Sequence, residues 1–222
     1  MFPIWDDTPT KKFPLTTVIL IALNSMIFLY QVSLGERFNE FIYSMGLLPF
    51  EITHHIDILP TGPSPIYLTI FSSMFMHGSV VHLLGNMLFL WIFGNNVEDY
   101  LGRKKFLFFY LICGISAAFT QIVFNSDSTV PMVGASGAIA GVLGAYMVLY
   151  PRAKITTVII IIFFIRLIKL PAIVVLGFWI LYQFLYGLSS LAATTGEGGV
   201  AWFAHIGGFI CGIILIKLFK PF

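Results

Sequence analysis

Four polar residues stand inside otherwise apolar stretches of this sequence, and together they could perform acyl chemistry. They are His82, Asn86, Ser136 and His205. A serine hydroxyl attacks poorly until a base takes its proton, and histidine is the usual base because its ordinary pKa of about 6.5 lies near neutrality. His82 and Asn86 are four residues apart, so both project from one face of a helix. The set offers a nucleophile, a base and two hydrogen-bond donors.

Ser136 has a local setting that suits a nucleophile. It follows Gly134 and Ala135, precedes Gly137, and stands where a loop is expected to become a helix. The glycines permit a tight entry, and a helix N-terminus favours developing negative charge. We therefore predict that the Ser136 amide, His82 and Asn86 donate hydrogen bonds to the oxyanion formed when Ser136 attacks a carbonyl.

The composition says which solvent surrounds these residues. Hydrophobic residues make up 58% of the 222 and charged residues only 10%, which is outside the range of soluble globular domains. The chain is expected to be an integral membrane protein in a lipid bilayer, with one domain over residues 1–222. A formal charge of +2 gives no reason to expect nucleic acid. Cys113 and Cys211 lie within apolar runs and suggest neither a disulfide nor a metal site.

Apolar runs predict an all-α bundle of six transmembrane helices. The expected spans are Leu15 to Leu34, Ser79 to Val97, Phe106 to Phe124, Ser136 to Tyr150, Pro171 to Leu191 and Ala201 to Leu218. The run Ile155 to Ile165, at about 11 residues, is shorter than the roughly 17 to 25 that a spanning helix needs. We expect it at one membrane surface, as strand, helix or coil. The segment Gly35 to Gly78 is predicted to be a large structured outer loop between the first two spans.

The cationic residues set the expected orientation, because Lys and Arg accumulate on the cytoplasmic side. With six spans and both termini cytoplasmic, Arg37 is the one Lys or Arg placed outside. A rise of ~1.5 Å per residue then puts the four polar residues about 16 to 22 Å above the cytoplasmic ends of their helices. A nucleophile, a base and two donors are thus predicted to share one depth.

Three motifs carry a family resemblance. His82-Leu83-Leu84-Gly85-Asn86, Gly134-Ala135-Ser136-Gly137-Ala138 and Ala204-His205-Ile206-Gly207-Gly208 occur in that order on the second, fourth and sixth expected spans. Together with Glu98, with Leu101-Gly102-Arg103 and with Phe178-Trp179, they resemble the rhomboid intramembrane serine proteases of the prokaryotic six-span type. The resemblance implies a Ser136 and His205 dyad without an aspartate, and an oxyanion site of His82, Asn86 and the Ser136 amide. It also implies single-span membrane-protein substrates, no cofactor or metal, and the prokaryotic inner membrane.

One position departs from the resemblance. Some rhomboids carry an aromatic residue one helical turn after the serine that stacks on the catalytic histidine, whereas this sequence has Ala140 there. His205 must then be oriented by other means. Gly137 and Gly141 on one span, with Gly208 and Gly212 on another, form small-residue faces that predict close packing of the fourth and sixth helices.

Secondary roles and other functions remain open at this stage. Gln121 either holds water near Ser136 or bonds to a neighbouring helix, and His77 stands near the mouth of the site. A catalytically inactive rhomboid-like factor that binds membrane proteins is the alternative function, although both dyad residues are present. A transporter or proton channel is disfavoured because no acidic residue lies in mid-span and no inverted repeat is visible. The oligomeric state and the identity of the substrate do not follow from the sequence.

Overall fold

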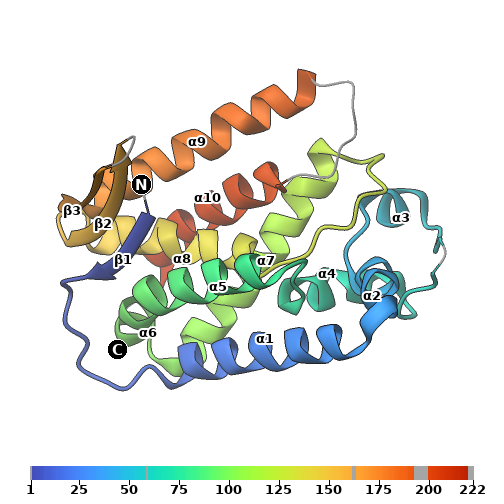
Figure 1. The fold of residues 1–222 in the computed structure, drawn as a ribbon, viewed down its shortest axis with the longest axis horizontal. Coiled ribbons are helices and arrows are strands. Elements are labelled where there is room, and N and C mark those ends of the chain that lie inside the picture. The colour runs from blue at the N-terminus through green and yellow to red at the C-terminus, as the bar shows by residue number, and fades with distance from the viewer. Residues whose placement is uncertain (1, 59, 162–163, 193–199, 220–222) are drawn as a thin grey trace.

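Six long helical segments form the body of the molecule in the computed structural model (Figure 1), which describes residues 2–58, 60–161, 164–192 and 200–219. They are α1 (Leu15–Ser33), α5 (Val80–Phe89), which continues through a π-helical turn (Leu90–Gly94) into α6 (Asn95–Leu101), α7 (Arg103–Phe124), α8 (Ser136–Leu149), α9 (Ala172–Ala192) and α10 (Trp202–Leu218). Each coincides with one of the six apolar runs.

Four of the helices have the length and composition to cross a membrane. These are α1, the continuous helix Val80–Leu101, α7 and α9, the last over Ala172–Leu191. Helices α8 and α10 are apolar but shorter than these. The structure therefore agrees with an integral membrane protein whose elements are mostly helical.

The segment between α1 and α5 is structured, as expected. It holds η1 (Gly35–Arg37), α2 (Phe38–Met45), α3 (Pro49–His54), η2 (Ile66–Leu68), α4 (Thr69–Ser72) and η3 (Ser73–Phe75). A short bridge between Leu47 and Met132 joins this segment to the loop before α8. Because that loop leads into Ser136, the inserted segment supports one wall of the site.

The all-α prediction is wrong at one end of the molecule, where three strands form an antiparallel sheet. Strand β1 (Phe2–Asp6) pairs with β2 (Lys154–Ile161), and β2 pairs with β3 (Phe164–Pro171). The run Ile155 to Ile165 thus lies largely in two strands, with residues 162–163 outside the described ones. Its β-branched residues, such as Thr156, Thr157 and Val158, pack well on a pleated surface. Hydrophobicity alone did not reveal this preference.

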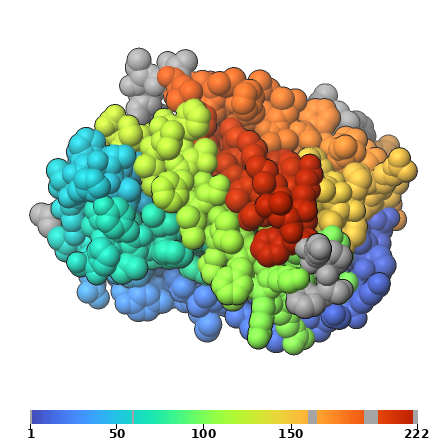
Figure 2. All heavy atoms as spheres, turned by 180° about the vertical axis from the view of Figure 1, so that it is seen from behind, coloured from blue at the N-terminus to red at the C-terminus, as the bar shows by residue number. Residues whose placement is uncertain are grey.

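Small residues let the central helix α8 sit deep in the bundle. Its residues from Gly137 to Tyr146 are all buried. A methyl group on Gly208 would overlap the Gly137 carbonyl, and one on Gly212 would overlap the Gly141 carbonyl. The predicted close contact of these helices is therefore present. Figure 2 shows α10, in red, between α7 in green and α9 in orange.

Candidate active site

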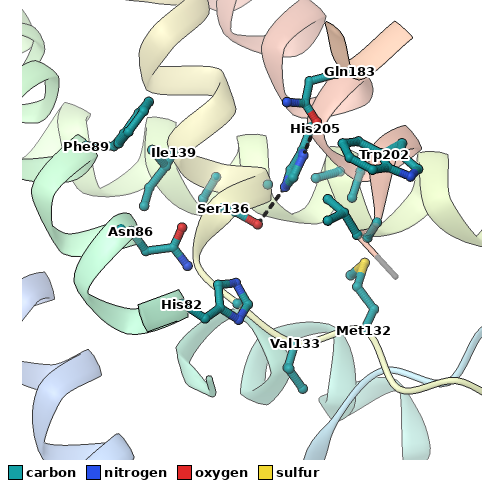
Figure 3. A pocket seen from close by; sticks show the side chains of 18 of the residues that line it. His82, Asn86, Phe89, Met132, Val133, Ser136, Ile139, Gln183, Trp202 and His205 are labelled. Carbon is teal, nitrogen blue, oxygen red and sulfur yellow. Dashed lines mark hydrogen bonds between the residues drawn. The ribbon is translucent and has the colours of Figure 1, made fainter. Parts of the chain in front are cut away.

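Two helix starts bring a serine and a histidine together. Ser136 is the first residue of α8, and His205 lies in the first turn of α10. The distance between Ser136 Oγ and His205 Nε2 is 2.8 Å, a hydrogen bond (Figure 3). The glycine contacts between α8 and α10 fix this approach, because they set how closely the two backbones run.

The bond opens onto a cavity of about 630 Å³. All four predicted site residues line it: His82, Asn86, Ser136 and His205. Figure 3 shows His82 and Asn86 on α5, facing Ser136 across this space. Residues from three helices are thus brought to one cavity. A volume of a few hundred Å³ with few polar groups is typical of a ligand or substrate site.

Gly134 shapes the wall between the serine and the two donors on α5. Its φ of +126° lies in a region that side chains rarely adopt. A Cβ at this position would lie 2.8 Å from the His82 ring and 3.5 Å from Asn86 Nδ2. Glycine is therefore required both by the backbone and by the space. It lets the loop before Ser136 pass directly beside His82 and Asn86.

Asn86 has a partner that sequence reasoning did not assign. Its Nδ2 donates to Nε2 of His77, 3.0 Å away, and both side chains are buried. Burial lowers the pKa of His77 to about 3, so this ring is neutral at neutral pH and can accept the bond. Gln31 of α1 holds the His77 backbone in turn, donating to its carbonyl at 3.2 Å and accepting from its amide at 3.1 Å.

This arrangement leaves one Asn86 donor for a second partner, because a side-chain amide nitrogen carries two protons. His77 therefore orients the Asn86 amide without using up its capacity. In the sequence, the short separation of His77 from His82 was the signal that His77 lies close to the site. Their rings do meet, with centroids 5.1 Å apart.

A comparison with known proteins shows which family the chain belongs to. The rhomboid domain model matches residues 65–222, about seven-tenths of the chain. The chain belongs to the rhomboid family. It is 34% identical over 214 residues to RHOMBOID-like protein 4 of Arabidopsis thaliana, covering 84% of this chain and 46% of the relative.

Other rhomboid relatives come from a bacterium and from mitochondria. Rhomboid protease GluP of Bacillus subtilis is 33% identical over 60% of this chain and 24% of its own length. Presenilin-associated rhomboid-like protein A, mitochondrial, of Danio rerio is 39% identical over 40% of this chain and 24% of its length. The rhomboid chain thus spans a quarter to just under half of these relatives. With mitochondrial relatives among them, family membership does not support the predicted prokaryotic inner membrane.

His205 of this rhomboid is oriented from α9 rather than from α8. Ala140 brings no ring to it, as the sequence indicated. Instead, Gln183 Oε1 lies 2.8 Å from His205 Nδ1, and the Trp179 ring packs with its centroid 5.6 Å from that of the imidazole. Sequence reasoning missed Gln183. The signal was a side-chain amide inside an expected span, since such polar groups are costly unless paired.

Gln121 and the two cysteines of the rhomboid chain all lie where α7 meets α10. Gln121 Oε1 accepts the Ala204 amide at 3.3 Å, while its Nε2 donates to Asn125 at 3.1 Å. It thus joins α7 to the start of α10, which is the interhelical alternative. Cys113 and Cys211 are free thiols that contact each other between the same two helices. Among the described residues, no three His, Cys, Asp or Glu side chains gather as metal ligands.

Proposed function

We propose that the chain is a serine endopeptidase that cleaves transmembrane segments of other membrane proteins inside the bilayer. Ser136 is the nucleophile and His205 its general base. The Ser136 amide, His82 and Asn86 form the oxyanion site, with His77 orienting Asn86. The single observation that carries the proposal is the 2.8 Å bond between Ser136 and His205 at the edge of the cavity. Rhomboid membership and the similarity to a rhomboid protease support it.

The chemistry follows from these positions. His205 Nε2 takes the Ser136 proton as Oγ attacks the carbonyl carbon of the scissile peptide bond. The carbonyl oxygen becomes an oxyanion, which the three donors stabilise. Collapse of this intermediate expels the amine, which receives the proton from Nε2, and leaves an ester on Ser136. Water then attacks the ester while His205 Nε2 takes its proton, and that proton passes to Ser136 Oγ as the new C-terminal carboxyl product leaves.

Labelling with a fluorophosphonate in detergent tests the activated serine. The wild-type protein should be labelled and Ser136→Ala should not. Ser190→Ala is the matched control, because the Ser190 hydroxyl donates to the Gly187 carbonyl within its own helix, α9. Absence of label on the wild-type protein would favour the inactive rhomboid-like alternative. Label that persists in Ser136→Ala would assign it to a different nucleophile.

We further propose six spans, both termini in the cytoplasm and a site in the outer half of the membrane. The support is the one-sided distribution of Lys and Arg. Single cysteines at Thr10, Asp127 and Phe222 test it in a background with Cys113 and Cys211 replaced by alanine. A membrane-impermeant thiol reagent applied to intact cells should label only position 127. Label at 222 without label at 10 would require an odd number of spans.

Substrates are proposed to be single-span membrane proteins cut near the outer end of their helix. The cavity lies at the Ser136 end of α8, which is the outer end in this orientation. Its lining is mainly apolar, with a few convergent polar groups, which suits a short unwound stretch of a hydrophobic segment.

A further inference from the structure

Gln183 of α9 is a buried amide whose neighbours along the chain are exposed. Its side chain is 5% exposed, whereas its neighbours Leu181, Tyr182, Phe184 and Leu185 are each about half exposed. Its Oε1 lies 2.8 Å from His205 Nδ1, on the side of the imidazole opposite Ser136 (Figure 3). A buried amide without a partner would cost free energy, so this contact accounts for its inward position.

We propose that Gln183 is a positioning residue that holds His205 in the tautomer required of a general base. The inference rests on the proposed function, in which Nε2 of His205 accepts the Ser136 proton. Gln183 itself touches neither Ser136 nor the bond to be cleaved in this assignment. It acts through the imidazole.

The tautomer argument starts from the donors and acceptors of a neutral imidazole, which has one of each. Ser136 can be activated only if Nε2 carries no proton, because Nε2 must accept one. The ring proton must then reside on Nδ1, where it needs an acceptor. Gln183 Oε1 supplies that acceptor at ordinary hydrogen-bond length. With Nδ1 donating to Gln183, Nε2 is left to accept from the serine hydroxyl.

The other groups around His205 in the described part of the chain do not replace this acceptor. Ala140 has no polar side chain, and the Trp179 indole can donate but not accept. Ser136 bonds to the opposite nitrogen. The carboxylate that orients the histidine in many serine proteases has its counterpart here in a neutral amide. A neutral acceptor suits this depth, because an unpaired carboxylate is costly in a membrane.

A mechanical consequence follows from where Gln183 sits. The acceptor comes from α9, whereas Ser136 and His205 come from α8 and α10. Correct alignment of the base therefore depends on α9 being seated against α10. Displacement of α9 by more than the length of a hydrogen bond would leave the dyad residues in place but free the imidazole to place its proton on Nε2.

The experiment reads the tautomer directly. Protein with ¹⁵N-labelled histidine is examined by NMR at about pH 8, where an ordinary histidine is neutral, and His205 is assigned by its loss in His205→Ala. Wild-type protein should show a protonated Nδ1 and a bare Nε2. Gln183→Leu keeps the size but removes the acceptor, so the Nδ1-protonated signature should be lost. Gln183→Glu keeps an acceptor oxygen and should retain it.

Activity should follow the tautomer. Gln183→Leu is expected to lower kcat and the fluorophosphonate labelling rate by about 10- to 100-fold, the usual range for groups that orient a ligand or a base from behind. Gln183→Glu should recover most of the loss. Tyr186→Leu is the matched control, because it removes one ring contact of α9 with Trp202 on α10, with centroids 5.3 Å apart, without removing an acceptor from His205. It should leave both the tautomer and the labelling rate close to wild type.

Each outcome decides the proposal. An unprotonated Nδ1 of His205 in the wild-type spectrum overturns the proposal, even if Gln183→Leu does not fold. A Gln183→Leu protein with normal kcat and an unchanged spectrum also overturns it, and equal losses in Gln183→Leu and Tyr186→Leu would assign the effect to packing. The tautomer can be read in Ser136→Ala as well. Failure of the endopeptidase proposal is therefore separable from failure of this one.

Discussion

The two ends of α8 bury polar side chains in different ways. At the end we call the dyad end, Ser136 and His205 meet beside a cavity of about 630 Å³. At the other, the sheet end, the Tyr146 hydroxyl donates to Asp6 Oδ2 at 2.7 Å, and Asn96 Nδ2 donates to the same oxygen at 2.9 Å. At both ends, burying these polar groups costs free energy unless they are hydrogen-bonded.

The sheet end shows that such polarity can be structural. Glu98 accepts the Thr16 amide at 2.8 Å, the Thr17 amide at 2.7 Å and the Thr17 hydroxyl at 2.8 Å. It therefore pairs amides that the first turn of α1 leaves unbonded. At the dyad end, by contrast, His82 and Asn86 face open space. Access to a cavity, rather than burial of a polar group, distinguishes the site.

The largest expected effect tests the dyad end. Ser136→Ala and His205→Ala should each reduce cleavage of a helical membrane substrate by at least about 10³-fold, and the double variant should be no worse than either, because the two residues act as a unit. Single-turnover cleavage in detergent measures this. If His205→Ala retained more than about a tenth of wild-type activity, another base would be present, and additive losses would mean that the two residues act separately.

A smaller loss is expected from the oxyanion side. Asn86→Ala should lower kcat by around 10²-fold with little change in KM, because the donor acts mainly in the transition state. His77→Ala should give a milder version of the same kinetic effect, since it leaves the Asn86 amide in place but without its 3.0 Å partner. Thermal stability is measured on the same preparations. If Asn86 only joins helices, unfolding should cost about 0.6 to 2 kcal/mol less while kcat of the folded protein is normal.

Some residues of the candidate site could be identified from the sequence, and others could not. Ser136, His205, His82 and Asn86 were found because they are polar residues in apolar runs at matched depth. Gln183 was not singled out, and His77 was placed near the mouth of the site without a partner, because bonds to residues 22 and 9 positions away follow only from the folded structure.

The sheet was not predicted for a related reason, although a strand was one of the conformations left open for Ile155 to Ile165. Its first strand, Phe2–Asp6, pairs with residues about 150 positions later along the chain, so no local pattern reveals the pairing. The second strand is an apolar run whose β-branched residues favour a strand. The prediction considered only that this run is too short for a helix to cross the bilayer. The six long helical segments, in contrast, lie close to the apolar runs, because a long apolar run is a local pattern that the sequence shows directly.

A stability effect without a catalytic effect is expected for Glu98 at the sheet end. Glu98→Ala leaves two buried amides and a hydroxyl of α1 without their acceptor, which should lower the free energy of unfolding by about 2 to 3 kcal/mol. Fluorophosphonate labelling of the folded fraction should be normal. Asp99→Ala is the matched control, because Asp99 accepts the Lys11 and Lys12 amides in an exposed setting. A Glu98→Ala protein that is stable but inactive would contradict the division between the two ends.

The smallest effect separates charge from hydrogen bonding at Asp6. Burial raises the pKa of this carboxyl, although its bonds from Tyr146 and Thr8 oppose the shift. The folded state therefore holds the proton to a higher pH than the unfolded chain does, and the stability from this uptake, complete below about pH 3.9, is lost as pH rises through the folded pKa. Asp6→Asn is neutral throughout, so it should gain on wild type between pH 4 and pH 7, by no more than about 1 kcal/mol.

Asp6→Ala provides the contrast, because it removes the acceptor as well as the charge. The Tyr146 hydroxyl and the Asn96 amide would then be unpaired at every pH, at a cost of roughly 1 to 3 kcal/mol that should not vary between pH 4 and pH 7. Unfolding of the three proteins across this range measures both parts. If the free energy of unfolding of Asp6→Asn fell relative to wild type as pH rose, the site would stabilise the carboxylate rather than penalise it. The sheet end would then hold a buried charge that stabilises the fold. In that case hydrogen bonding alone would not explain the polar groups at this end of α8.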